Sequence, residues 1–418
     1  MTSKERTLKT LAHKSPDRIP IDFGATPVTG IHVLAIERLR EHFGFEKRPV
    51  RVIEPYQMLG EIDPELMDAL QIDIIGLSPK NNMFGIYNSG ELKEFETFWG
   101  QTVLVPKSFN TSYDDSGNLL IHPEGDLTTP ASAKMPKASY FFDAVIRQEP
   151  IDESKLDPAD NLEEFNPIED EDLEYWKEEI KKIEDTDKAV VANFGGTAFG
   201  DIALVPGLNL KRPKGIRDIA EWYMSVIMRP DYIHEIFSKQ SDIALSNLEK
   251  IHKVVGDKVD IVFLCGTDFG TQDSQFCGID TLEEMYLPYY KKINDWIHDN
   301  TNWKTFKHSC GAVEPFINSF IEAGFDILNP VQINASGMDP RHLKDTYGDR
   351  ITFWGGGVDT QKVLSFGTEK DVKIQVEENL RIFGENGGYV FNTVHNIQAN
   401  VPPRNLIAML ETIKKVNG

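Results

Sequence analysis

Short apolar runs alternate with amphipathic segments through the second half of this 418-residue chain, and this alternation most constrains its fold. Five such runs have the length and composition of buried strands: Asp260–Cys265, Trp303–His308, Asp326–Asn329, Ile351–Trp354 and Gly388–Phe391. The segments between them carry apolar residues at helical spacing. Strand, helix and strand, repeated in this way, predict parallel strands joined by helical crossovers.

The helices themselves have recognisable ends. Asp280, with Glu283 three residues later, predicts a capping-box variant at the start of one long helix, whose apolar positions run from Leu282 to Trp296. A final helix is expected to begin at the pair Pro402-Pro403, because proline suits the first helical turn. Further helices are predicted over Val313–Ala323, Arg341–Tyr347 and Glu369–Phe383, and the final helix is expected to end at Lys415.

Three earlier segments resemble further buried strands: Arg18–Gly24, Ile72–Leu77 and Ala189–Phe194. Three and five make eight, the number that closes a (β/α)8 barrel. A doubly wound open sheet is the alternative, but no G-x-G-x-x-G sequence follows any of these strands. We therefore predict an α/β fold in which residues 1–418 form a single (β/α)8 TIM-barrel domain.

A long detour, about 81–188, separates the second and third predicted strands. Thr102–Pro106 and Asn118–His122 alternate in polarity, which predicts an inserted β-hairpin excursion. An acidic stretch from Asp152 to Asp187 follows. We interpret it as a solvated loop leading into a surface helix, with a docking surface for a partner protein as the alternative.

Composition excludes several classes of function. Lys and Arg total 44 against 66 for Asp and Glu, a formal net charge of −22. Nucleic-acid binding and membrane-surface binding both favour basic patches, so neither is expected. Three cysteines do not make a disulfide scaffold, and no apolar run reaches the roughly 18 residues of a membrane span. We expect a cytoplasmic protein.

The sequence His308-Ser-Cys310-Gly311 ends one predicted strand and carries the strongest chemical signal. Residues i and i+2 of a strand share a face, and imidazole with thiolate suits Zn²⁺. A packed cysteine beside a hydrogen-bonded histidine is the simpler explanation of this pair alone. His395 follows the last strand and would supply a third ligand at the barrel mouth. Three protein ligands with an open fourth position are typical of catalytic zinc.

Polar residues follow the other strands as well, where a barrel places its active site. Asp268 is a candidate catalytic residue. Asp73 lies within an apolar strand, where a buried carboxylate needs a partner or a raised pKa, unless it occupies the strand edge. The predicted substrate- or corrinoid-binding residues are Asp73, Gln272, Asn329, Gln332, Asn396 and Gln398.

Several segments together resemble the uroporphyrinogen decarboxylase superfamily, in particular its methyltransferase branch. They are Lys4–Leu8 with Pro16–Asp22, His308–Gly311, Phe325–Gln332, Phe353–Gln361 and Val394–Gln398 with Val401–Pro403. The similarity in order and spacing extends from residue 4 to the C-terminus and is weakest over 81–188. The resemblance implies a (β/α)8 barrel, in agreement with the strand count.

Two activities are known within this superfamily. Its decarboxylases hold an eight-carboxylate tetrapyrrole with an arginine-rich N-terminal loop and need no metal, but residues 21–30 contain no arginine here. The methyltransferase branch binds zinc through an H-x-C pair and a third ligand, often cysteine. The pair is present at His308 and Cys310, and His395 stands where that cysteine is expected. One fewer thiolate leaves the metal a stronger Lewis acid, which suits an ether or amine leaving group.

The resemblance therefore implies a zinc-dependent methyltransferase in which His308, Cys310 and His395 are metal ligands. It would transfer a methyl group between a small substrate, such as an aryl methyl ether or methylamine, and the cobalt of a corrinoid (cobalamin) carried by a separate corrinoid protein. The identity of the methyl donor or acceptor and the oligomeric state stay open. The alternatives are a metal-free decarboxylase of a small or tetrapyrrole carboxylic acid and a corrinoid-docking binding protein.

Overall fold

Seven parallel strands form one curled sheet in the computed structural model, which describes residues 1–418. Their order is β15-β14-β13-β12-β11-β10-β3, so each strand pairs with its neighbour in the sequence of barrel strands. The bounds are β3 Ile74–Leu77, β10 Ala189–Ala192, β11 Ile261–Cys265, β12 Lys304–His308, β13 Ile327–Asn329, β14 Thr352–Trp354 and β15 Tyr389–Val390. The seven predicted strands at these places are confirmed.

The remaining predicted strand, 18–24, closes the sheet on itself through a single bridge. Ile21 pairs in parallel with Phe391, and the backbone N–H of Asp22 donates to the Phe391 carbonyl at 3.0 Å. On its other side the N–H of Asp73 donates to the Ile21 carbonyl at 2.9 Å. The segment therefore bonds to both edges of the sheet, and the (β/α)8 barrel is confirmed.

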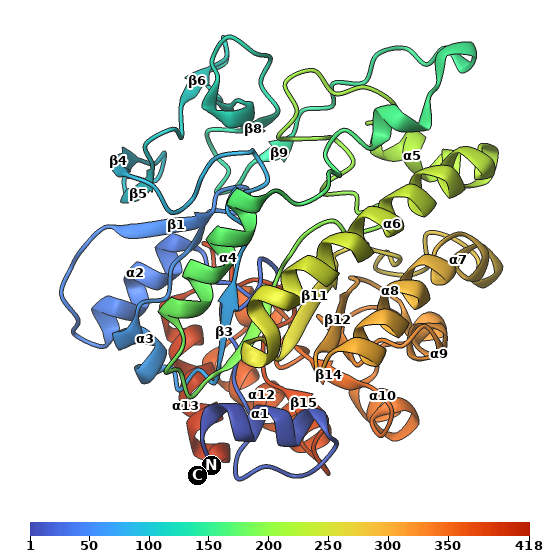
Figure 1. Ribbon diagram of the computed structural model, residues 1–418. Helices are drawn as coiled ribbons and strands as arrows, with labels where there is room; N and C mark the ends of the chain where they lie inside the picture. The colour runs from blue at the N-terminus through green and yellow to red at the C-terminus, as the bar shows by residue number, and fades with distance from the viewer.

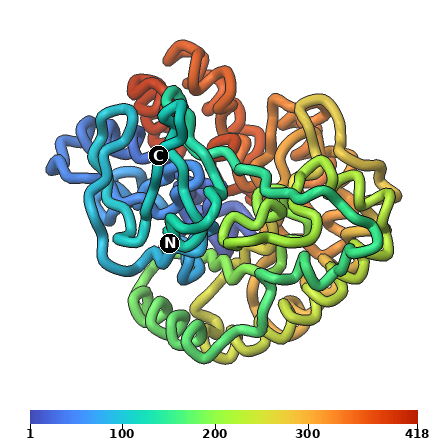
Figure 2. The backbone as a smooth tube through the Cα atoms, turned by 90° about the horizontal axis from the view of Figure 1, so that it is seen from above, coloured from blue at the N-terminus to red at the C-terminus, as the bar shows by residue number.

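Helices surround this barrel, and the view from above shows the chain passing around it in order from blue to red (Figure 2). An apolar cluster that includes Phe306 and Trp354 fills the barrel, while a much larger cluster lies between the strands and the outer elements. The helices are α1 Ser3–Leu11, α2 Val33–His42, α3 Pro64–Ala69, α5 Ile219–Met228, α6 Pro230–Val255, α7 Ile279–Met285, α8 Leu287–Asn300, α9 Ile317–Glu322, α10 Pro340–Tyr347, α11 Val363–Phe366, α12 Glu369–Phe383 and α13 Pro403–Asn417, with 3-10 turns η4 Gly256–Lys258 and η5 Glu314–Phe316. No helix combines the length and the apolar character that crossing a membrane requires.

The long helix predicted from Asp280 is two helices. α7 begins at Ile279 after Gly278, so Asp280 lies inside the first turn and no capping box forms. α7 ends at Met285, and α8 starts at Leu287 with Pro288 in its first turn. Proline has no N–H to donate to the preceding turn, so the helix breaks here. The apolar periodicity nevertheless continues across the break.

The detour over 81–188 is richer than the single hairpin expected. Thr102–Pro106 (β5) lies in a four-stranded sheet of order β2-β1-β5-β4, whereas β7 lies in another of order β6-β7-β8-β9. Figure 1 shows β4, β5, β6, β8 and β9 at the end of the molecule away from α1. The bounds are β1 Val50–Glu54, β2 Leu59–Gly60, β4 Leu92–Glu96, β5 Thr102–Pro106, β6 Thr111–Tyr113, β7 Leu119–Ile121, β8 Ala133–Met135, β9 Asp143–Ala144, η1 Pro123–Gly125, η2 Glu153–Lys155, η3 Pro158–Asn161 and α4 Asp170–Lys182.

The acidic stretch forms 3-10 turns followed by α4, whose single fully buried side chain is Trp176. Three acidic residues in its first turn face the positive end of the helix dipole, and lysines occupy its last turn. This is the loop and surface helix that the composition predicts.

Candidate metal centre

Three potential metal ligands converge at the carboxyl ends of the barrel strands. His308 is the last residue of β12, Cys310 follows two residues later, and His395 lies in the loop after β15. Their ligand atoms all lie within 4.8 Å of one another, and Cys310 Sγ is 3.3 Å from His308 Nε2. The structure thus brings together three side chains separated by up to 87 positions.

The His308 ring is oriented by a buried amide. Its Nδ1–H donates to Asn329 Oδ1 at 2.5 Å, and the Asn329 side chain in turn donates to the Trp354 carbonyl at 2.8 Å. This arrangement fixes the tautomer and leaves Nε2 with a free lone pair directed toward Cys310. Such an outer hydrogen bond is typical of a metal-bound histidine.

His395 is held differently. Its backbone adopts φ +66°, a left-handed conformation that is uncommon for residues other than glycine, and its Nδ1 accepts from the N–H of Asn396 at 2.8 Å. In this arrangement the lone pair of the ring lies at Nδ1. The two histidine rings meet edge to face with centroids 5.1 Å apart.

Burial sets the protonation states of this cluster. It lowers the pKa of His308 to about 4 and the pKa of His395 to about 3, so both imidazoles are neutral at pH 7. Burial also raises the pKa of the Cys310 thiol well above its ordinary value, with the neighbouring Asp268 carboxylate adding to the effect. Two imidazole nitrogens and one thiol that ionises on binding are the donor set of a zinc site.

Asp268 supports the cysteine loop from the adjacent strand end. Its Oδ1 accepts from the N–H of Cys310 at 2.6 Å and lies 3.7 Å from His308 Nε2. Gln332 accepts from the N–H of Gly311 at 2.8 Å and donates to Gln272 Oε1 at 3.0 Å. Asp268, Gln272 and Gln332 are therefore at the predicted place, and the two glutamines use their amides to hold loops.

Two other predicted binding residues are also occupied by protein contacts. Asn329 is fully buried against His308, as described above. Asn396 accepts from the N–H of Gly30 at 2.6 Å and donates to the Pro27 carbonyl and Gln57 Oε1, each at 2.9 Å. Both orient parts of the site, and neither has a free polar atom for substrate. Gln398 is half-buried and makes no side-chain hydrogen bond.

Asp73 does not belong to this site, so its predicted place is wrong. It directly precedes β3, at the amino end of the strands, whereas His308 ends β12 at the opposite end of the barrel. Its oxygens accept from Arg6 and Arg18, each at 2.7 Å, and from the N–H of Ile21 at 3.0 Å. The buried carboxylate has the charge partners it needs, which explains why it sits in an apolar segment.

One buried acid near the site was not singled out from the sequence. Asp201, in the loop after β10, is 8 % exposed, and burial together with the Asp268 charge raises its pKa to about 6. Its Oδ1 accepts from the N–H of Ala203 at 2.9 Å. In the sequence, Asp201 is a carboxylate that follows a glycine-rich loop nine residues after the end of the strand. Its spacing alone does not distinguish such a residue from a helix cap.

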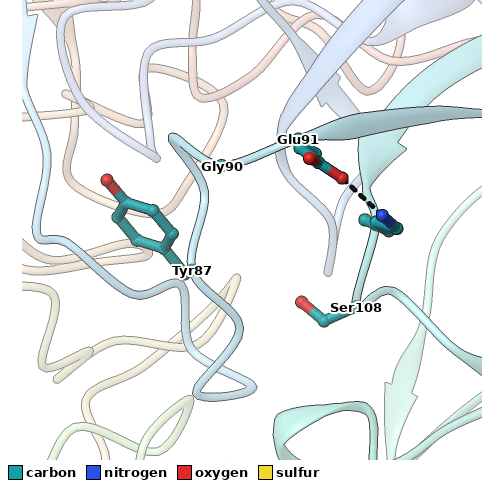
Figure 3. A pocket seen from close by; sticks show the side chains of 5 residues that line it. Tyr87, Gly90, Glu91 and Ser108 are labelled. Carbon is teal, nitrogen blue, oxygen red and sulfur yellow. Dashed lines mark hydrogen bonds and ion pairs between the residues drawn. The ribbon is translucent and has the colours of Figure 1, made fainter.

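A separate hollow lies within the inserted sheets and contains none of the predicted site residues. Tyr87, Gly90, Glu91, Lys107 and Ser108 line it, and an ion pair between Glu91 and Lys107 crosses it (Figure 3). It contains no histidine or cysteine, so the strand mouth is the candidate site.

Fold and cluster together define a (β/α)8-barrel protein with a candidate metal centre at the carboxyl ends of its strands. The uroporphyrinogen decarboxylase (URO-D) family model matches residues 144–416, and the chain belongs to this family. The matched range includes every barrel strand from β10 onward and all three potential ligands.

Individual relatives are distant. Uroporphyrinogen decarboxylases of Chlorobium chlorochromatii (strain CaD3) and Chlorobium luteolum (strain DSM 273 / BCRC 81028 / 2530) are each 25% identical over 142 residues, 32% of this chain. The aligned region spans only 38% of the length of these relatives. A solved methyltransferase from Methanosarcina mazei is 14% identical, with a TM-score of 0.53 over 100% of both chains, and this likeness shows the fold.

Proposed function

We propose that this protein is a zinc-dependent methyltransferase that moves a methyl group between a small methylated substrate and the cobalt of a corrinoid on a separate protein. The observation that carries the proposal is the convergence of His308, Cys310 and His395 within 4.8 Å at the mouth of a URO-D-family barrel. The Methanosarcina methyltransferase, which shares the fold, supports the same branch of the family.

The donor set fits zinc, and each ligand has a role in holding it. His308 Nε2, Cys310 Sγ and one nitrogen of His395 would bind the ion, and three protein ligands leave a fourth position for substrate. When bound, zinc supplies a Lewis acid that stabilises negative charge on the leaving heteroatom. Asn329 keeps the His308 lone pair pointed at the site, and Asp268 fixes the backbone of Cys310.

Methyl transfer to cobalt also requires alignment, because the nucleophile must approach the methyl carbon opposite the leaving atom. Gln332 and Asn396 tie down the loops that carry Cys310 and His395, which would help to keep a bound substrate in one position. The barrel and its insertion together form the one domain that we propose for residues 1–418. The corrinoid protein is proposed as a partner because the methyltransferase branch that this chain resembles uses one.

A metal-free decarboxylase acting on a tetrapyrrole is the competing function, since the named relatives are decarboxylases. Residues 21–30 contain no arginine to bind a polyanionic substrate. The charged residue of this segment is Asp22, a fully buried carboxylate whose oxygens accept from Trp354 Nε1 at 2.9 Å and the N–H of Ala25 at 3.0 Å. This loop therefore offers no cationic side chain to a carboxylate substrate.

The test is the zinc content of protein purified without chelators, for wild type and Cys310→Ala. We expect about one zinc per wild-type chain and almost none in the variant, because the thiolate is the strongest ligand of the set. Cys277→Ala is the matched control, since Cys277 is half-buried and outside the cluster, and it should keep its metal. Transfer of methyl groups to Co(I) cobalamin from ethers and amines is then measured for all three proteins.

Wild-type protein that contains no metal and takes up none would refute the zinc mechanism. The metal-free decarboxylase would then be the better explanation. If Cys310→Ala keeps its metal, the metal must bind somewhere other than the strand mouth.

A further inference from the structure

A lysine without any ion pair lies fully buried directly before the first histidine of the cluster. Lys307, on β12, is 0 % exposed, and its Nζ donates to the carbonyls of Thr267 at 2.6 Å and His308 at 2.7 Å. Its ammonium also lies over aromatic rings, with centroids at 4.8 Å for Phe269, 5.5 Å for Phe320 and 5.6 Å for Tyr290.

An apolar side chain would be the ordinary choice at this position. Alternate residues of β12 point into the barrel and outward, and Lys307 points outward to the helix layer, where burying an ammonium costs free energy. The aromatic faces offset part of that cost. An apolar side chain could not, however, donate to carbonyls on two different strand ends.

Those two carbonyls belong to the residues that position the cluster. Thr267 lies two residues beyond β11 and immediately precedes Asp268, which accepts from the N–H of Cys310. The register of β11 with β12 shifts between Phe263 and Cys265, and Cys265 then pairs with Lys307 as the last pair before the loop. A further contact joins the same segments, because the Phe269 N–H donates to Ser309 Oγ at 2.9 Å.

We propose that Lys307 is a positioning residue of the metal centre, which locks the loop after β11 onto β12 so that Cys310 and His308 keep their spacing. The inference rests on the proposed function in that it takes this cluster to bind zinc. Lys307 itself does not touch the cluster's ligand atoms, and it acts through the Thr267 and His308 carbonyls.

When the Lys307 charge is removed, the direction in which zinc affinity changes distinguishes a positioning role from a purely electrostatic one. Removing a positive charge near a cation site should strengthen cation binding by Coulomb's law alone. Loss of an outer positioning contact should weaken it, typically by about 10- to 100-fold. Lys307→Met, which nearly preserves shape and suits an aromatic surround, is therefore expected to bind zinc about 10- to 100-fold more weakly than wild type.

Lys344→Met is the matched control, because Lys344 is also a buried lysine that donates to a backbone carbonyl, that of Gly387 at 2.6 Å. Gly387 precedes β15, at the end of the barrel away from the cluster. Zinc affinity is measured by competition with a chelator. Co²⁺ substitution adds the thiolate-to-cobalt charge-transfer band, which should weaken in Lys307→Met and stay unchanged in Lys344→Met. Lys307→Gln, which keeps one donor group, should lie between wild type and Lys307→Met.

A second readout needs no metal. Amide hydrogen exchange at Cys310 and Phe269 should become about tenfold faster or more in metal-free Lys307→Met, because the loop opens more often. Zinc affinity that is unchanged or higher in Lys307→Met, with unchanged exchange, would overturn the proposal. Wild-type protein that binds no zinc would refute the proposed function instead, and the exchange comparison would still decide whether Lys307 orders the loop.

Discussion

Ionisable groups gather at both ends of the barrel, but only at the amino end are they joined to arginine in ion pairs. At the amino end Asp73, fully buried, is paired with Arg6 and Arg18, and Asp17 completes the network on Arg6. At the carboxyl end a thiol, two imidazoles and the Asp268 carboxylate lie together with no guanidinium among them. The first cluster is saturated by the protein itself. The second can accept a cation, and this difference separates a structural cluster from a candidate functional one.

The largest effect in this comparison is expected from breaking the saturated end. Asp73→Asn removes the carboxylate charge shared by two arginines and should cost about 3–5 kcal/mol of unfolding free energy, because Arg18 loses its charge partner and Arg6 keeps only Asp17. Zinc content should not change, since the metal centre lies at the other end of the barrel. Urea unfolding and metal analysis of the same preparation measure both quantities.

Glu385→Gln provides a control for the loss of a charge partner at the surface. Glu385 pairs with Arg341, and both side chains are about 40 % exposed. Water screens this pair, so the unfolding midpoint should stay close to that of wild type. If Asp73→Asn were equally mild, or if it lost zinc, the division of roles between the two ends would be wrong.

Most of the barrel could be predicted because its strands are local patterns. Each apolar run can be recognised from a few consecutive residues. The alternation of side chains along a strand then predicts that His308 and Cys310 share one face. The insertion was harder, because its sheets depend on distant pairings such as Val50 with Val103. Local alternation of polarity indicates the strands but does not show which of them pair.

The roles of individual polar residues were the least predictable part of the site. Asp73 was predicted as a binding residue, whereas it lies directly before β3 at the amino end of the barrel, where Arg6 and Arg18 bind its carboxylate. Asn329 was placed correctly, but its partner His308 lies 21 positions away on the adjacent strand. Which atom satisfies a buried amide depends on tertiary contacts that the sequence does not display.

A smaller effect should follow from loosening the metal centre without removing a ligand. Asn329→Ala deletes the acceptor for His308 Nδ1–H, so the ring can rotate or change tautomer. Zinc affinity should fall by about 10- to 100-fold, the usual cost of losing such a partner. Asn405→Ala is the control, because Asn405 is also a buried amide that donates to backbone carbonyls, those of Leu364 and Gly367, but lies on α13 in the outer helix layer. Both variants should lose stability, and only Asn329→Ala should lose metal affinity.

The smallest expected effect concerns the carboxyl-end cluster alone, and it is the number of protons released when this cluster binds metal. Metal-free Cys310 is protonated at pH 7, because burial raises its pKa, so it must lose one proton to become a ligand. The two histidines should release none, since burial lowers their pKa values to about 4 and about 3 and they are already neutral. Zinc affinity should therefore rise about tenfold per pH unit between pH 6 and pH 7.

Calorimetric titration with zinc in buffers of different ionisation enthalpy counts these protons directly. Histidines with an ordinary pKa near 6.5 would together add about 1.5 protons at pH 6 and only about 0.5 at pH 7. A buried, neutral pair predicts a constant release of about one proton over this range, from the thiol alone. A proton count that climbs as the pH falls would mean that the imidazoles are solvated and charged in the metal-free protein. The carboxyl end would then be an open, water-filled cluster rather than a site prepared for a cation.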